Sequence, residues 1–239
     1  LAARLGVARL SVKDESMRSP LGSFKALGAP IALVRQILRL HPTLAPTGIL
    51  AGRCANELRS YTVISATDGN HGRGLAAAAR DAGCRCVIVL HAQVSEEREQ
   101  AIAVHGAQIV RIAGNYDESV AEAARLAEAH GWQVVSDTSY EGYETIPRDV
   151  MQGYGTIAAE VLEQTGDPRD AAGSFTHVFL QGGVGGLAAG LASYFWEFHG
   201  AQRPTLVVVE PAQADCLLQS AIQGRPARAT GSVDSVMAG

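Results

Sequence analysis

The sequence predicts an α/β protein built on doubly wound parallel sheets. Apolar runs of four to six residues alternate along the chain with longer, helix-like segments, the order expected of strand–helix–strand units with right-handed crossovers. Most of these runs are continuously apolar, as in parallel strands that are buried on both faces. Two of them end in glycine-containing turns, at the strand ends where open α/β sheets bind ligands.

Composition limits the classes of function. The 239 residues are 47% hydrophobic, which is enough for one large core or two modest ones. The formal charge of −4 carries no basic excess, so we expect no nucleic-acid partner. No uncharged run approaches the ~20 residues of a membrane span, so we expect no membrane partner. The four cysteines have neither a disulfide framework nor zinc spacing, which favours reduced thiols in a cytoplasmic protein.

The first substantial helix is predicted shortly after the start of the chain. Ser23 is a suitable N-cap for it. Its buried face is predicted at helical spacing to contain Leu27, Ile31, Val34 and Leu38. Pro30 is expected to kink or restart this helix. Before it we expect a weak strand over residues 9–15, and after it residues 41–60 are expected to form a connection.

Residues 59–147 are predicted to form a small α/β domain. Its four strands are expected at 61–65, 86–90, 108–112 and 133–136. Helices are predicted over 71–81, after the cap Ser95, and over 116–130, where Gly131 provides the C′ residue. Roughly 75 residues suit a domain of four strands.

The remainder of the chain continues the alternation. The sequence predicts a helix over 150–164, a strand over 176–181, a glycine-rich loop over 182–186, a helix over 187–199 and a strand over 205–210. We expect residues 1–58 and 148–239 to form one larger domain. Because the chain opens on Leu1 and stops without a closing element, we also expect it to be a piece of a longer protein.

Lys25 is the first residue to which chemistry can be attributed. It falls in the first turn of the predicted helix, where the helix dipole disfavours an extra proton on its amine. An unprotonated lysine amine can form a Schiff base with an aldehyde. The alternative is a solvated lysine near a helix start.

The loop over residues 65–72 is the second candidate. It runs from a strand end into a helix start, so several backbone N–H groups converge on one point that suits a carboxylate or phosphate. Asp68 is an unusual residue beside a bound anion, and proton transfer would give it a task. Alternatively, Asp68 or Asn70 caps the helix.

The glycine-rich loop Gly182-Gly183-Val184-Gly185-Gly186 is the third candidate. Its backbone can approach a phosphate at a helix N-terminus. The same stretch satisfies G-x-G-x-x-A over 183–188, and Glu210 follows at the end of the next strand. That layout is also typical of dinucleotide binding, so an NAD(P)-dependent oxidoreductase stays open as an alternative.

Asp137 follows the fourth predicted strand, where it is placed to hold a substrate ammonium group or simply to form a turn. Tyr116 opens a predicted helix and either lines the same cleft or packs. The seven histidines show no metal-ligand spacing, so we expect no metal site.

Together these motifs resemble the fold-type II family of pyridoxal-phosphate enzymes. The shared pattern is Ser23-Phe24-Lys25, then Gly69-Asn70-His71-Gly72, then the loop 182–186. Within that family the chain is similar to the diaminopropionate ammonia-lyases, and the stretches that carry this likeness cover nearly its whole length. They are residues 23–28, 66–74, 115–120, 137–143, 146–148, 152–154 and 181–186.

The resemblance implies two parallel-sheet domains, the larger one incomplete at its C-terminal side, and pyridoxal 5′-phosphate as cofactor. Lys25 would hold the cofactor aldehyde, with Phe24 beside it. Asn70 would contact the ring hydroxyl, and the loop 182–186 the phosphate. Substrate-binding residues would be Thr67, Asp68, Gly69, His71, Tyr116 and Asp137. Lys25 and Asp68 would act as bases on opposite faces of the substrate.

The function implied is elimination of ammonia from D- and L-2,3-diaminopropionate, a small amino-acid substrate, to give pyruvate and ammonia. The resemblance also implies a homodimer. A serine or threonine dehydratase is the alternative within the same chemistry. A non-catalytic fragment is the alternative outside it.

Overall fold

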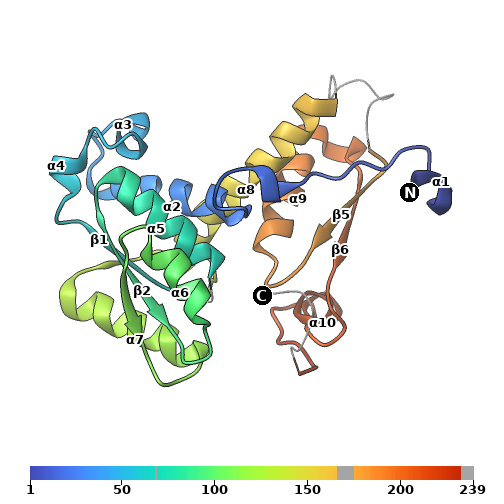
Figure 1. Cartoon of the computed structure of the whole chain (residues 1–239). Helices are drawn as coiled ribbons and strands as arrows, with labels where there is room; N and C mark the ends of the chain where they lie inside the picture. The colour runs from blue at the N-terminus through green and yellow to red at the C-terminus, as the bar shows by residue number, and fades with distance from the viewer. Residues whose placement is uncertain (68, 166–174, 233–239) are drawn as a thin grey trace.

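The computed structural model describes residues 1–67, 69–165 and 175–232. Two lobes lie on either side of a pair of packed helices, α2 (Lys25–Leu40) and α8 (Thr145–Thr165) (Figure 1). Both sheets are parallel, so the predicted α/β class is confirmed. Among the described helices, none has the combination of length and hydrophobicity that a membrane span requires.

The first lobe contains a four-stranded parallel sheet of order β3-β2-β1-β4. Its strands are β1 (Thr62–Ala66), β2 (Arg85–Leu90), β3 (Gln108–Arg111) and β4 (Gln133–Val134). The helices that alternate with them are α5 (Asn70–Ala82), α6 (Glu96–Ala103) and α7 (Tyr116–His130). The predicted order of strands and helices is therefore confirmed, although β4 is shorter than expected.

Alternate residues of the central strands belong to two different cores. Val63 and Ile88 join the large core that includes Leu75 of α5, whereas Ile64 and Val87 join a smaller core with Ala123 of α7. Because successive strand residues point to opposite faces, helices cover both faces of the sheet. This is the doubly wound arrangement that the apolar runs predict.

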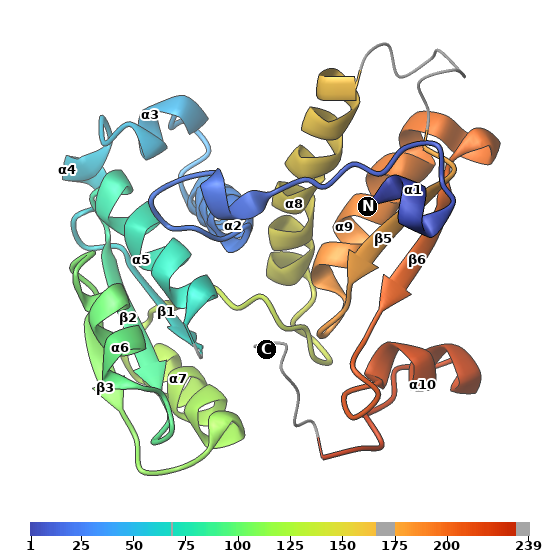
Figure 2. The same cartoon turned by 45° about the vertical axis from the view of Figure 1, so that its right-hand side comes forward.

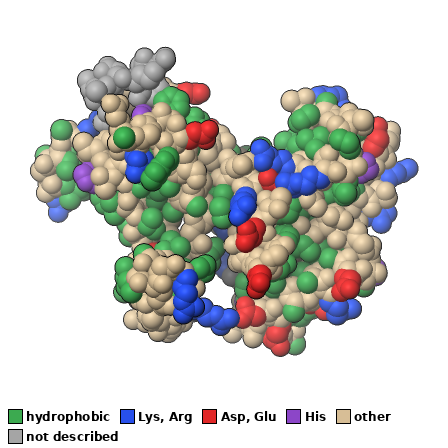
Figure 3. All heavy atoms as spheres, turned by 180° about the vertical axis from the view of Figure 1, so that it is seen from behind, with side chains coloured by type: hydrophobic (Ala, Val, Ile, Leu, Met, Phe, Trp, Pro, Cys, Tyr) green, Lys and Arg blue, Asp and Glu red, His purple; other side chains and the backbone are tan. Residues whose placement is uncertain are grey.

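The second lobe contains the parallel pair β5 (His177–Gln181) and β6 (Thr205–Val209). Helix α9 (Gly186–His199) packs between this pair and α8. A short 3₁₀ helix (Gly200–Gln202) precedes β6, and α10 (Cys216–Gln223) follows it. Helix α10 was not predicted from the sequence. Seen from behind, the surface is hollowed between the first lobe and the α10 region (Figure 3).

Helix α2 differs from its predicted form. It runs continuously through Pro30, so the predicted restart is wrong. Ile31, predicted to be buried, is 37% exposed. Val34 is buried as predicted, and Leu27 and Leu38 pack, partly buried, against the core. The other buried residues of the helix are Gly28, Ala29, Ala32, Leu33 and Ile37. Since α5 and α8 both pack against α2, its buried face is wider than a single stripe and is centred elsewhere.

Two other regions also differ from expectation. Residues 9–14 form no strand; they lead from α1 (Ala2–Leu5) to a 3₁₀ helix (Glu15–Met17), whose N-cap Asp14 accepts from the Ser16 N–H. This segment has no partner strand within the described residues, and its contact with the rest of the protein includes the ion pair of Lys13 with Glu160. The expected connection 41–60 contains two short helices, α3 (Pro46–Leu50) and α4 (Ala55–Leu58).

Glu160 of α8 binds the N-terminal segment to this helix. Arg18 donates to both of its oxygens, at 2.8 and 2.5 Å, and Lys13 Nζ lies 2.7 Å from Oε2. Hydrogen bonds from Arg18 and then Lys13 lower the pKa of Glu160 from 4.5 to about 2. A carboxyl whose pKa is depressed by folding stabilises the folded state above its unfolded pKa.

We therefore expect Glu160→Gln to lower the unfolding free energy by about 1 kcal/mol at pH 7. The difference from the parent should fade as the pH falls from about 4.5 towards 2, where the parent carboxylate becomes protonated. Urea unfolding across this pH range measures it. Glu163→Gln, at an exposed position of the same helix, is the control and should show no such trend.

Candidate active site

Lys25 and Asp137 form an ion pair between the lobes. Lys25 is the first residue of α2, and the Ser23 hydroxyl accepts from its backbone N–H at 3.3 Å. Its Nζ lies 2.7 Å from Oδ2 of Asp137, and the two side chains are 25% and 15% exposed. Asp137 belongs to the segment between β4 and α8, which crosses from one lobe to the other (Figure 2). The structure thus brings together two residues that sequence analysis singled out separately.

The surroundings of Asp137 keep it ionised. Burial alone would raise the pKa of this carboxyl, but the electrostatic effect of the neighbouring His71 and Lys25 side chains, with the hydrogen bond from Lys25, outweighs burial and lowers it to about 2. Asp137 is therefore a largely buried anion at neutral pH. It already binds an ammonium group, that of Lys25.

Tyr143 and His71 fix the backbone on which Asp137 stands. The Tyr143 hydroxyl donates to the Val134 carbonyl at 3.0 Å and accepts from the Ser136 N–H at 2.9 Å. Burial raises the pKa of Tyr143, so the hydroxyl stays protonated and able to donate. Nε2 of His71 lies 2.8 Å from the Val135 carbonyl oxygen. The role of Tyr143 was missed, because its partners only become neighbours when the chain turns back after β4.

The predicted anion-binding loop enters α5 beside this pair. Thr67 is buried, and its hydroxyl accepts from the N–H groups of Gly69 and Gly72 at 3.2 and 3.3 Å. Asn70 is exposed at the first position of α5. Asp68, the predicted second base, lies outside the described residues.

The glycine-rich loop joins β5 to α9. Gly185 is the N-cap of α9, has φ = +92° and offers no side-chain cap, so the first N–H groups of the helix are available to a ligand. A Cβ on Gly183 would meet nothing within 4 Å, whereas one on Gly182 would lie within about 3 Å of side-chain atoms of Val208, Leu217 and Glu210. An open backbone cradle at a helix start fits a phosphate group.

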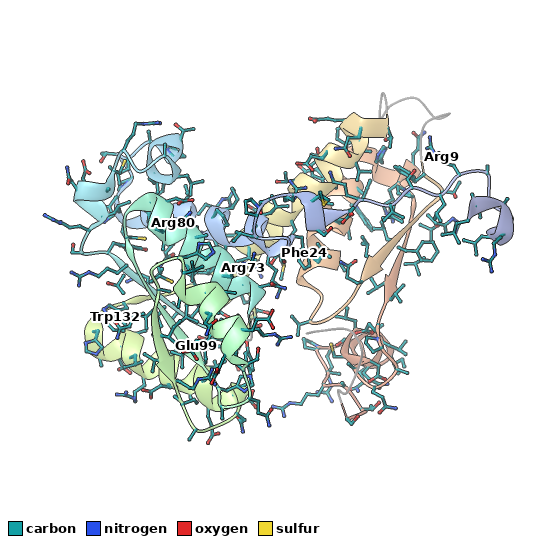
Figure 4. All side chains as sticks on the ribbon, viewed as in Figure 1. Arg9, Phe24, Arg73, Arg80, Glu99 and Trp132 are labelled. Atoms are coloured by element: carbon teal, nitrogen blue, oxygen red, sulfur yellow. The ribbon has the colours of Figure 1, made fainter. Side chains whose placement is uncertain are left out.

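Tyr154 of α8 connects the lysine to this loop. Its ring packs edge-on against Phe24, with centroids 5.2 Å apart, and Figure 4 shows Phe24 where α2 meets α8. A Cβ on Gly28, one turn after Lys25, would lie 2.7 Å from the Tyr154 ring, and one on Gly186 would lie 4.0 Å from it. One side chain therefore separates the start of α2 from the start of α9. No role was predicted for Tyr154 from its position in the sequence.

Glu210 is placed differently from the dinucleotide alternative, whereas Tyr116 opens its helix as predicted. Glu210, the proposed ribose-binding acid of the dinucleotide alternative, accepts from the N–H groups of Leu217 and Leu218, each at 2.8 Å. Its carboxylate caps α10, which removes the main support for dinucleotide binding. Tyr116 lies at the first turn of α7 with its ring edge-on to His91.

We expect Glu210→Ala to destabilise the protein by about 1–2 kcal/mol, because two N–H groups of α10 lose their acceptor. The free energy of unfolding in urea measures the loss. Glu197→Ala, at an exposed position of α9, should change stability by less than about 0.5 kcal/mol. Equal stability of the two variants would contradict the capping role.

Comparison with known proteins shows the family to which this chain belongs. The chain belongs to the family of pyridoxal-phosphate dependent enzymes, whose family model matches residues 1–239. It is 38% identical over 245 residues to diaminopropionate ammonia-lyase of Salmonella typhimurium, a match that covers all of this chain and 60% of that protein. It is 31% identical over 224 residues to a chloroplastic biosynthetic threonine dehydratase of Arabidopsis thaliana, covering 94% of this chain and 32% of that protein.

Solved structures give the same picture. Holo diaminopropionate ammonia-lyase from Escherichia coli superposes with a TM-score of 0.82 at 37% identity, covering 95% of this chain and 56% of that one. The same enzyme with an aminoacrylate-PLP azomethine reaction intermediate gives a TM-score of 0.77 at 37% identity, covering 91% and 55%. The chain thus spans about three fifths of the length of the curated ammonia-lyases it matches. The predicted fold-type II class is confirmed.

Proposed function

We propose that this protein is a pyridoxal-phosphate-dependent ammonia-lyase that converts D- and L-2,3-diaminopropionate to pyruvate and ammonia. The observation that carries the proposal is the contact between Lys25 and the buried carboxylate of Asp137. It provides a lysine at a helix start and, beside it, an anion that holds an ammonium group. The likeness to diaminopropionate ammonia-lyases over the whole chain supports it.

The residues present fit pyridoxal phosphate. Lys25 would supply the amine for its aldehyde, and the uncapped start of α9 with Gly182 to Gly186 suits its phosphate. Asn70 would contact the ring hydroxyl, and Phe24 would lie beside Lys25. When bound, the cofactor accepts the electron pair that remains when the substrate Cα loses its proton.

Separate residues of the protein remove the substrate proton and bind the substrate. Lys25 removes a proton from one face of the substrate, and Asp68 is the proposed base on the other face. Thr67, Gly69 and His71 receive the substrate carboxylate at the start of α5. Asp137 and Tyr116 receive the β-ammonium group, which leaves as ammonia.

We also propose a division into two domains, 1–58 with 148–239 and 59–147, which follows the two sheets. A homodimer and a cytoplasmic location belong to the same proposal. Neither nucleic acid nor membrane has a part in it.

A serine or threonine dehydratase is the competing function, since threonine dehydratases are also similar to this chain. The site favours the ammonia-lyase, because a buried anion at Asp137 suits a cationic leaving group better than a neutral hydroxyl. Pyruvate release from D- and L-2,3-diaminopropionate and from serine separates the two functions. Faster turnover of both diaminopropionate isomers is expected, with D-isomer turnover lost in Asp68→Asn. Faster turnover of serine would favour the dehydratase.

A further inference from the structure

His71 carries a buried nitrogen that the fold leaves without a hydrogen bond. Its side chain is 1% exposed. Nε2 lies 2.8 Å from the Val135 carbonyl oxygen, and because a carbonyl only accepts, Nε2 carries the hydrogen. Nδ1 has no hydrogen-bond partner among the described residues. Buried polar atoms are rarely left so, and such an exception calls for an explanation.

The position of Nδ1 suggests one. It lies 3.8 Å from Oδ2 of Asp137, the same oxygen that lies 2.7 Å from Nζ of Lys25. A lysine, a carboxylate and a histidine from α2, the β4–α8 segment and α5 therefore meet at one oxygen atom. The His71 ring is held to the Val135 carbonyl, two residues before Asp137, which keeps the ring next to the carboxylate.

This arrangement bears on how Lys25 becomes reactive. Its ammonium must lose a proton before the nitrogen can attack an aldehyde. Once Lys25 is neutral and bound elsewhere, Asp137 would be a buried anion without a cation, which is costly. A second proton acceptor next to Asp137 solves both problems, because it takes the proton that Lys25 must lose and becomes the cation that Asp137 then lacks.

We propose that His71 accepts the proton that Lys25 releases, with Asp137 passing it on. A proton moves from Nζ of Lys25 to Oδ2 of Asp137, and from Oδ2 to Nδ1 of His71. Lys25 becomes a neutral amine, Asp137 stays ionised and His71 becomes the cation, so the net charge is unchanged. The neutral amine would then be able to bond to the aldehyde carbon of the cofactor, with its two hydrogens and the aldehyde oxygen leaving as water. The role in cofactor binding rests on the proposed function.

The other groups around Asp137 suit this transfer. Tyr154 of α8 and Tyr143 of the β4–α8 segment also interact electrostatically with Asp137. Burial raises the pKa of both hydroxyls, so they remain neutral. Among the described residues, Lys25 and His71 are therefore the neighbours of Asp137 that can carry a positive charge. Once Lys25 no longer neutralises Asp137, a proton on Nδ1 of His71 would restore a cation beside this carboxylate.

Nitrogen NMR of the His71 ring tests the proposal without cofactor or turnover. In the parent chain at pH 7.5, Nδ1 should be unprotonated. In Lys25→Met, which removes the competing cation, Nδ1 should be protonated. In Lys25→Met/Asp137→Asn, Nδ1 should again be unprotonated. An unprotonated Nδ1 in Lys25→Met would overturn the proposal. This result is independent of whether the protein proves to be a lyase.

The rate at which the chain binds pyridoxal phosphate provides a second measurement. In His71→Asn the lysine-dependent absorbance change should appear about 10²-fold more slowly at pH 7. This deficit should shrink towards pH 9, because hydroxide can then deprotonate Lys25 directly. His130→Asn, at an exposed histidine of α7, should bind at the parent rate. A deficit in His71→Asn that is equal at all pH values would indicate a structural role only and would overturn the relay.

Discussion

Replacing Lys25 with alanine is expected to abolish both cofactor attachment and ammonia-lyase activity. In the proposed function the lysine amine is both the nucleophile that bonds to the cofactor aldehyde and the base on one face of the substrate, so a single change would remove two functions. We expect the absorbance band near roughly 410–420 nm to be lost and pyruvate formation to fall at least about 10³-fold. Spectra with added pyridoxal phosphate and a pyruvate assay measure the two effects.

The sequence offers a sharp control for this experiment. It contains only two lysines, Lys13 and Lys25, and Nζ of Lys13 lies 2.7 Å from Glu160, in the contact of the N-terminal segment with α8. Lys13→Ala should therefore keep the band and the activity while losing some stability. If the band persisted in Lys25→Ala and disappeared in Lys13→Ala, the cofactor would be attached to Lys13, and the proposed site would be contradicted.

Local signals were sufficient to predict most elements of the first lobe. Ser95 caps α6 through its hydroxyl, and Gly131 ends α7 in the left-handed conformation, both as predicted from residue type and position. The continuous apolar runs predicted buried parallel strands because each strand residue meets a core on one face or the other. These features depend on neighbours that are close in sequence or on average burial.

Features set by distant neighbours could not be predicted in the same way. Lys25 and Asp137 are 112 residues apart, and nothing in either local sequence indicates that they pair. The buried face of α2 depends on where α5 and α8 pack against it. Tyr154 reads as an ordinary helix residue until Phe24 and Gly186 come to lie on either side of it. The active site is therefore less predictable than the fold, since it is made of such distant contacts.

The close packing of α2 on α8 leads to the second large expected effect, a marked loss of stability in Gly153→Ala. A methyl group there would lie 2.5 Å from the Leu27 carbonyl oxygen and 2.8 Å from Cα of Gly28. These are backbone atoms, which cannot move aside by a rotamer change, so α2 must shift as a whole. We expect a cost of about 3 kcal/mol, well above the roughly 1 kcal/mol that alanine gains over glycine within a helix. The free energy of unfolding in urea measures the difference.

Gly155→Ala tests whether contact with α2, and not loss of a helical glycine, causes the effect. Gly155 lies in the same helix, and a Cβ there would meet only the Tyr194 ring, at 3.5 Å. This is ordinary van der Waals contact, so the variant should match the parent or gain up to about 1 kcal/mol. Because α2 begins with Lys25, the shift in Gly153→Ala should also weaken pyridoxal phosphate binding, whereas Gly155→Ala should leave it unchanged. Similar stability of the two variants would mean that α2 can move away from α8 at little cost, and the rigid link between the lysine and the glycine loop through Tyr154 would then be wrong.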